Sequence, residues 1–193
     1  MKNLLTTFTL STLLFAYSYS NDTEKKTAKN DENQTEVVQK VSYNQEKPTI
    51  VGVAVSNDKF TTLVTAVKAA SLVDVLSGKG PFTVFAPLNS AFDKLPKGTV
   101  ETLLKKENKE NLSDLLTYHV VAGKVKAADL LKLIKDNDGS YAMKTVQGSE
   151  LTARLIDGSV VLTDKKGNTS KVVMTDVEAS NGVIHAIDAV VMP

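Results

Sequence analysis

The chain contains no cysteine and no tryptophan, and only 6% of its 193 residues are aromatic. Without cysteine it has no disulfide framework, no zinc–thiolate site, no thiol nucleophile and no lipid attached through a thioether. A single arginine, Arg154, stands beside 22 lysines. The guanidinium groups that favour bidentate recognition of phosphate or carboxylate are therefore nearly absent. The 23 basic and 22 acidic side chains give a net charge of +1, which argues against a nucleic-acid partner.

Residues 1–20 have the composition of a secretory signal peptide. Lys2 precedes an apolar run that extends to Tyr17, and small residues occupy the −3 and −1 positions of two candidate cleavage sites, which end at Ser18 and Ser20. The run is short and rich in hydroxyl groups, whereas a bilayer span needs about 20 mainly apolar residues. A signal peptide therefore fits better than a membrane anchor or a disordered amphipathic N-terminus. We expect a secreted mature chain, extracellular or periplasmic, that does not insert into a membrane.

Residues 21–46 are polar and carry charges of both signs, with little that is apolar before Val37. Such a composition cannot bury enough apolar surface to offset the entropy of ordering the chain. We expect a flexible linker there. It is either a tether that holds the domain away from a surface or an irregular N-terminal segment without a function. Residues 47–193 then form one domain, and a chain of this length buries roughly 68–70% of its unfolded surface without covalent staples.

The first half of this domain has the hydrophobic period of helices. Four apolar residues share one helical face behind Asp58, a candidate N-cap; they are Phe60, Leu63, Val64 and Val67. Further helices are expected over residues 100–105, 112–118 and 127–134. A short strand buried on both faces is expected over residues 82–86, and Pro87, which has no N–H group, is expected to end it.

The second half changes to the period of two that is typical of strands. Apolar residues alternate or cluster over 151–155, 160–162 and 172–174, and turn sequences lie between these runs at 157–158 and 166–168. Asn181-Gly182 predicts a tight turn with positive φ before a final strand. Helices followed by strands predict an α+β domain with an antiparallel sheet.

Three segments are more specific than these periods. They are FTVFAPLNSAF at 82–92, YHVV at 118–121 and ASNGVIHAID at 179–188. In this order and spacing they resemble the fasciclin domain, which is also found in beta-ig-h3 and periostin, over residues 49–193. The resemblance implies a wedge with a seven-stranded, β-sandwich-like core and helices packed along one side. One departure is Leu88, where the family commonly carries a Thr or Ser that caps the following helix, a role that Asn89 can take over.

The resemblance also implies a function and a set of interaction residues. Fasciclin domains are secreted or surface modules of adhesion that bind matrix proteins, integrins or polysaccharide. In the animal members an Asp-Ile pair just before the Asn-Gly-Val-Ile-His segment contributes to integrin recognition, and Asp176 and Val177 align with it. Tyr118 and His119 match a Tyr-His pair implicated in adhesion, either by direct contact or by support of the nearby surface. These four residues are the predicted interaction site.

An enzyme would have to use His119 or His185, since the chain has no other histidine. A serine hydrolase needs a base within hydrogen-bond reach, and no Gly-x-Ser-x-Gly elbow occurs. His185 falls in an apolar row of the final strand, where a hydrogen-bonded core histidine is typical. The segment 136–139 is similar to a calcium loop, but aligning its glycine puts Ile134 and Thr145 at positions that need acidic ligands. We therefore expect a polar turn there, no metal site, no cofactor and no catalytic residue.

The leading hypothesis is a secreted, non-enzymatic adhesion or surface-interaction module. Its partner would be an extracellular-matrix or cell-surface protein or a polysaccharide, with weak self-association as an added mode. Without an aromatic cluster or an arginine hot spot, the affinity of one domain should be modest, and several copies would act together. The alternative is an extracellular or periplasmic protein that binds a small apolar or sugar ligand in a pocket between helices and sheet. A third hypothesis, hydrolysis, requires a cleft that holds a histidine beside a nucleophile.

Overall fold

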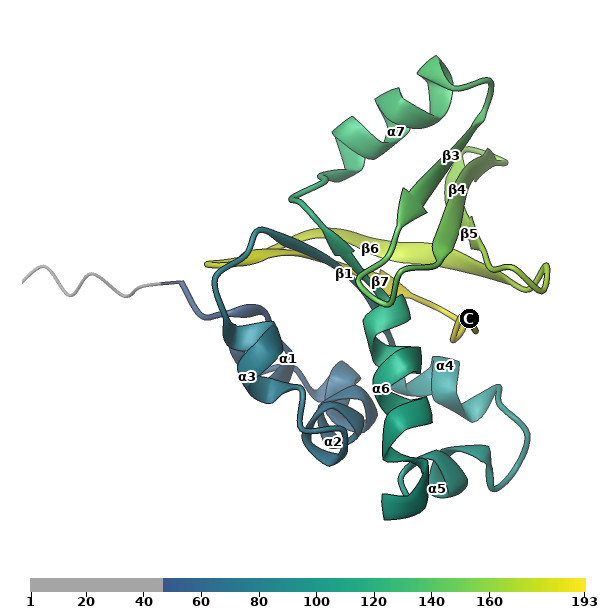
Figure 1. Cartoon of the computed structure of the whole chain (residues 1–193). Coiled ribbons are helices and arrows are strands. Elements are labelled where there is room, and N and C mark those ends of the chain that lie inside the picture. Colours follow the sequence, from purple (N-terminus) through teal and green to yellow (C-terminus); the bar gives the residue numbers. More distant parts are fainter. Residues whose placement is uncertain (1–46) are drawn as a thin grey trace, which may run out of the picture. The chain divides into compact units, whose positions relative to one another are not determined.

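The computed structural model describes residues 47–193, in which short helices pack beside a strongly curved sheet (Figure 1). The predicted signal peptide, 1–20, and the predicted linker, 21–46, lie outside the described residues. Within 47–193, none of the helices combines the length and the apolar character that a membrane crossing requires.

The helices lie mostly in the first half of this range. They are α1 (Ile50–Val55), α2 (Thr61–Ala69), α3 (Val73–Ser77), α4 (Asn89–Asp93), α5 (Thr99–Leu103), α6 (Lys109–Tyr118) and α7 (Ala127–Asp136), with 3-10 turns at Asp58–Phe60 and Lys106–Asn108. Helices α2, α5, α6 and α7 confirm the helices predicted from the hydrophobic spacing. Helix α1 was not predicted, because its β-branched sequence IVGVAV favours a strand. The Thr49 side chain, which accepts a hydrogen bond from Gly52 N, caps it as a helix instead.

Two of the predicted caps are wrong. Asn57, not Asp58, caps the turn before α2, since its side chain accepts from Lys59 N at 3.0 Å. Asn89 does not replace the missing hydroxyl at α4, whose N-cap Leu88 makes no side-chain bond. The Asn89 Oδ1 accepts instead from Thr62 N at 3.1 Å, and its Nδ2 donates to the Asp58 carbonyl at 2.8 Å. Asn89 thus ties α4 to the first turn of α2.

The strands form one sheet in the order β2-β1-β7-β6-β5-β4-β3 within the described residues. Their bounds are β1 (Phe82–Pro87), β2 (Val120–Ala122), β3 (Ser140–Lys144), β4 (Glu150–Ile156), β5 (Ser159–Thr163), β6 (Thr169–Ala179) and β7 (Gly182–Ile187). The α+β class and the seven strands agree with the prediction. Strands β1, β4, β5 and β6 confirm runs that the sequence pattern marks as strands, and β7 is the expected final strand.

The sheet is mixed, whereas the order of helices and strands predicted an antiparallel one. Strand β1 pairs with β7 in parallel, from Phe82 opposite Gly182 to Pro87 opposite Ile187. The hydrophobic period of a strand does not specify its neighbour, so a pairing between distant segments was not predictable from it. A bridge between Val121 and Thr145 joins the two edges of the sheet, which is thereby nearly closed into a barrel.

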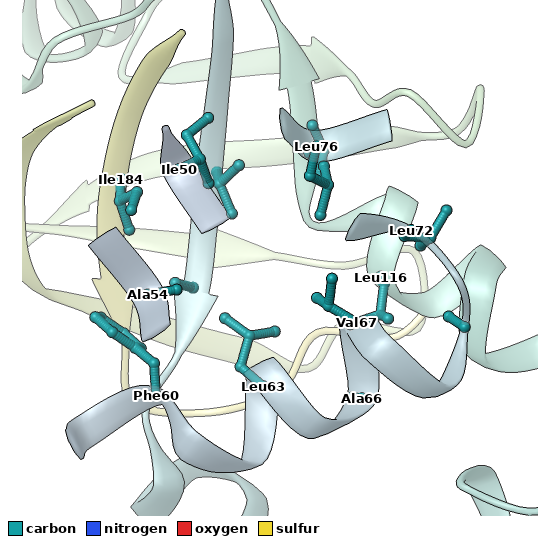
Figure 2. Close-up of a cluster of buried hydrophobic side chains, with 14 of the residues drawn as sticks. Ile50, Ala54, Phe60, Leu63, Ala66, Val67, Leu72, Leu76, Leu116 and Ile184 are labelled. Atoms are coloured by element: carbon teal, nitrogen blue, oxygen red, sulfur yellow. The ribbon is translucent and has the colours of Figure 1, made fainter. Parts of the chain in front are cut away.

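The core has two apolar clusters, one on each face of β1. In the first, α1, α2, α3 and α6 pack against the sheet, and Figure 2 shows Ile50, Leu63, Val67 and Leu76 converging there. The second cluster lies beneath α7, which packs on β3 and β4. Val84 and Ala86 belong to the first cluster and Phe85 to the second, which confirms a strand buried on both faces.

The turns agree with the sequence in two places and differ in one. Asp157 and Gly158 both have positive φ between β4 and β5, as a two-residue hairpin turn requires. Gly139 N donates to the Ile134 carbonyl at 2.9 Å, so the segment 136–139 is the predicted polar turn after α7. Gly182, in contrast, does not have the positive φ predicted for it. A Cβ there would collide with the Phe82 carbonyl, so glycine is needed for the close approach of β1 and β7.

Candidate interaction surface

Tyr118, the last residue of α6, is fully buried. Its hydroxyl donates to the Glu150 carbonyl at 2.9 Å, which joins the end of α6 to the start of β4. Burial, and to a lesser degree the charge of Asp164, raises the pKa of this phenol above its usual value. The side chain therefore acts as a neutral hydrogen-bonded anchor.

His119 is also internal, with 2% of its surface exposed. The imidazole Nδ1 lies 2.8 Å from the Leu115 carbonyl, and Val191 N donates to Nε2 at 3.3 Å. Since a carbonyl only accepts and an amide only donates, the ring is neutral with its proton on Nδ1. Burial lowers the pKa of His119 to about 4. A partner at the surface does not reach Tyr118 or His119 here, and their burial agrees with the supporting role rather than with direct contact.

His185 is a buried, hydrogen-bonded core histidine, as the sequence pattern predicted. Its Nε2 lies 2.9 Å from the Val125 carbonyl, and Asp176 N donates to its Nδ1 at 3.3 Å. The ring also lies beside Phe85, with 5.6 Å between the ring centroids. His185 thereby fixes both the chain before α7 and the part of β6 that carries Asp176.

Asp176 lies on the surface at an irregular stretch of β6. The register of β6 against β7 shifts between Met174 and Val177, and Asp176 has a φ of 56°. Its Oδ1 accepts from Ala127 N at 2.9 Å, so the carboxylate satisfies one of the unpaired N–H groups at the start of α7. Val177 is half-buried, pairs with Ile184 and packs against the first apolar cluster. Of the four predicted site residues, Asp176 alone has an exposed side chain in this structure.

Next to Asp176, Glu178 is surrounded by lysines that sequence reasoning missed. Its carboxylate lies 2.7 Å from Lys47 Nζ, 3.0 Å from Lys126 Nζ and 3.9 Å from Lys124 Nζ. Hydrogen bonds from Lys47 and then Lys126 lower the pKa of Glu178 to about 2. Lys47 comes from the segment before α1, and Lys124 and Lys126 come from the segment before α7. No local spacing in the sequence brings these two segments to Glu178. Exposed ion pairs contribute little to stability, so the cluster matters chiefly as a charged surface.

A groove continues this surface towards the loop between α3 and β1. We call it the 77–81 groove, and its volume is about 530 Å³. The polar and charged residues that line it are Thr49, Ser77, Lys79, Lys124, Ser180 and Asn181. Lys124 belongs both to this groove and to the cluster around Glu178, so the two features form one continuous surface.

Asn181 holds the walls of the groove together. Its Oδ1 accepts from Ile50 N at 2.9 Å, and its Nδ2 donates to the carbonyls of Leu76 at 2.8 Å and Gly78 at 2.9 Å. One side chain thus joins the start of α1, the end of α3 and the 77–81 loop to the turn between β6 and β7. Gly80 allows this contact, because a Cβ at that position would collide with the backbone of Asn181.

We expect Asn181→Asp to lower the free energy of unfolding by about 2 kcal/mol, since two partly buried carbonyls lose their donor and face a carboxylate oxygen instead. The bond from Ile50 N would remain. Urea unfolding followed by circular dichroism measures the change. The matched control is Asn111→Asp on an exposed site of α6, which adds the same charge. Equal stability of the two variants would contradict the joining role of Asn181.

An apolar cavity lies between the helices and the sheet, where the small-ligand alternative expected a pocket. Ile50, Leu63, Val67 and Leu76 line it, and Figure 2 shows them around the same space. Its volume is only about 30 Å³, whereas ligand pockets measure roughly 300–1,000 Å³. It is a packing void, and a ligand would enter only if the helices moved apart.

The comparisons with known proteins agree with this architecture. Residues 58–193 match the model of the fasciclin domain. Protein sll1483 of Synechocystis sp. is 52% identical over 145 residues, which cover 75% of this chain and 73% of that protein. The cell surface glycolipoprotein MPB83 of Mycobacterium bovis is 36% identical over 145 residues, 72% of this chain and 58% of that protein.

The fold comparison finds the same architecture in a solved structure. A solved FAS1 domain pair from the insect cell adhesion molecule fasciclin I has a TM-score of 0.68 at 21% identity, over 77% of this chain and 52% of that one. At that identity the likeness concerns the fold alone. Since the family model also covers most of the described residues, the chain belongs to the fasciclin domain family.

Proposed function

We propose that this chain is a secreted, non-enzymatic surface-interaction module that binds a matrix protein, a cell-surface protein or a polysaccharide through the surface formed by Asp176, Glu178 and the 77–81 groove. Fasciclin domains are generally non-enzymatic modules of the adhesion type. Secretion follows from the predicted signal peptide at 1–20, and it agrees with the description of the M. bovis relative as a cell surface protein.

The observation that supports this proposal most strongly is that the surface combines exposed charges with a backbone fixed from within. Exposed charges from distant segments meet there, and the buried His185 and the half-buried Asn181 hold the backbone beneath them. Surfaces that bind are commonly loops positioned by a rigid scaffold. Both ring nitrogens of His119 and of His185 are bonded to backbone groups. Neither ring has a nitrogen left to act as a base for a nucleophile, which supports a role without chemistry.

The proposal can be tested by blocking this surface. The chain contains no cysteine, so a single introduced cysteine can be labelled with maleimide-polyethylene glycol without side reactions. We expect a label on Ser180→Cys, at the rim of the groove, to abolish binding to a glycan and matrix-protein array. A label on Thr169→Cys, exposed at the opposite end of β6, is the control and should leave binding intact. An unlabelled chain that binds nothing on the array, or a Ser180 label without effect, would overturn the proposal.

A further inference from the structure

We propose that the 77–81 groove binds the acidic sugars of a polysaccharide, which carry carboxylate or sulfate groups. This inference rests on the proposed function and narrows its partner to one chemical class. The groove has the size for such a ligand, since about 530 Å³ lies within the roughly 300–1,000 Å³ of small-molecule sites. A sugar residue with its charged group fits there while the rest of the polymer continues over the surface.

The charge of the surface favours an anion. Lys79 and Lys124 line the groove, and none of its lining residues carries a carboxylate. The nearest acidic group that the ion pairs identify is Glu178, 3.9 Å from Lys124 Nζ, and it is shared with Lys47 and Lys126 at shorter distances. Asp176 and Asp129 also act on Lys126, but neither of them belongs to the groove lining, in which Lys79 and Lys124 are the charged residues. Lys124 therefore makes only a long ion pair with Glu178, and Lys79 makes no ion pair among residues 47–193. Both ammonium groups are available to bind an anion.

The remaining donors suit a sugar. Thr49, Ser77 and Ser180 line the groove from three segments, and hydroxyl side chains both donate to and accept from the hydroxyls of a sugar ring. No hydrogen bond from the backbone N–H of Lys79 or Gly80 occurs within residues 47–193. Unpaired N–H groups in a turn commonly bind anions.

An acidic peptide suits this groove less well. Peptides that bind in extended form add a strand to an open sheet edge. The two strands that begin beside the groove offer no such edge, since β1 lies between β2 and β7, and β7 lies between β1 and β6. The lining also contains no aromatic side chain, and aromatic anchors are enriched where proteins bind proteins. Recognition through lysines and hydroxyls should instead be sensitive to salt.

Calorimetric titration of the purified full chain with defined probes tests the inference. The probes are oligogalacturonate for carboxylate, oligosaccharides of dextran sulfate for sulfate, maltohexaose as the neutral sugar and polyglutamate as the acidic peptide. We expect one or both acidic sugars to bind, and maltohexaose and polyglutamate to bind at least tenfold more weakly. The preferred acidic probe identifies the charged group. Binding should weaken when sodium chloride is raised from about 50 to about 300 mM.

Three variants locate the binding. Lys79→Gln/Lys124→Gln should weaken the acidic sugar about tenfold. The matched control, Lys135→Gln/Lys144→Gln, removes the same charge from exposed sites on α7 and β3 and should leave affinity unchanged. Glu178→Gln should tighten binding about threefold, because it removes the competing carboxylate from Lys124. A structural role of these lysines alone would not produce that gain.

The inference fails if both lysine variants lose equal affinity, if Glu178→Gln weakens binding, or if polyglutamate or maltohexaose binds as well as the acidic sugars. These outcomes differ from failure of the proposed function. If the chain binds array ligands and the Ser180 label blocks this binding, but Lys79→Gln/Lys124→Gln leaves the affinity unchanged, only the polysaccharide site is overturned. A chain that binds no array ligand would overturn the interaction module itself.

Discussion

Replacing Gly182 with alanine is expected to lower the free energy of unfolding by about 3 kcal/mol, the upper end of overpacking penalties. The added methyl group would collide with the Phe82 carbonyl and lie 2.8 Å from Ile50 Cδ1. Phe82 is opposite Gly182 in the parallel ladder of β1 and β7. Neither backbone can therefore move without breaking the pairing that joins the two halves of the domain.

Gly78→Ala is the control for this experiment, because the nearest atom to its Cβ would be the Val75 carbonyl at 3.2 Å and its φ is −66°. We expect that variant to change stability by less than about 1 kcal/mol, as for most surface substitutions. Urea unfolding of both variants measures the difference. Similar stabilities would mean that the close approach of β1 and β7 does not require glycine.

Acidification should destabilise the fold through His119. Burial lowers its pKa from 6.5 to about 4, so the unfolded chain takes up a proton near pH 6.5 and the folded chain only near pH 4. The contribution of neutral His119 to the free energy of unfolding is complete above pH 6.5. It declines as the pH falls towards 4, and it is lost below that. With 1.36 kcal/mol for each pH unit between the two values, the loss at pH 4 is about 3 kcal/mol.

Urea unfolding of the wild type and of His119→Gln at pH 7.5, 5.5 and 4 separates this effect from the rest. Between pH 7.5 and 5.5 the wild type should lose about 1.4 kcal/mol more than the variant. The lowered pKa values of Asp164, Asp188 and Glu178 also cost stability in acid, but these carboxylates contribute equally to both proteins. Identical pH dependence of the free energy of unfolding in the two proteins would show that folding does not lower the pKa of His119.

Much of the secondary structure was predictable, because it depends on local spacing. Phe60 in the 3-10 turn before α2 and Leu63 and Val67 within α2 are buried, as their period indicates. The three motifs were sufficient to predict the fold, since the matched family model and the fasciclin I structure lead to the same domain. The internal position of His185 also followed from its place in an apolar row.

What the sequence left open depends on contacts between distant segments. Gly182 looked like a turn residue, but its role is set by Phe82, a hundred positions earlier. Asn181 looked like half of the same turn, and its side chain instead joins three elements. The charge cluster at Glu178 and the 77–81 groove combine residues that no spacing rule relates. Of the residues on the proposed surface, the family motif named Asp176, which stays a prediction, and the lysines became apparent only in the structure.

Recognition of an acidic polysaccharide by the 77–81 groove depends on Lys79 and Lys124 in its lining. A titration of the isotope-labelled chain with oligogalacturonate, followed by amide chemical shifts, tests it most directly. We expect shifts confined to residues 77–81, 123–126 and 176–182, which saturate with the ligand and disappear in Lys79→Gln/Lys124→Gln. Shifts centred on any other surface, or a spectrum that neither this probe nor the dextran sulfate oligosaccharides change, would contradict it.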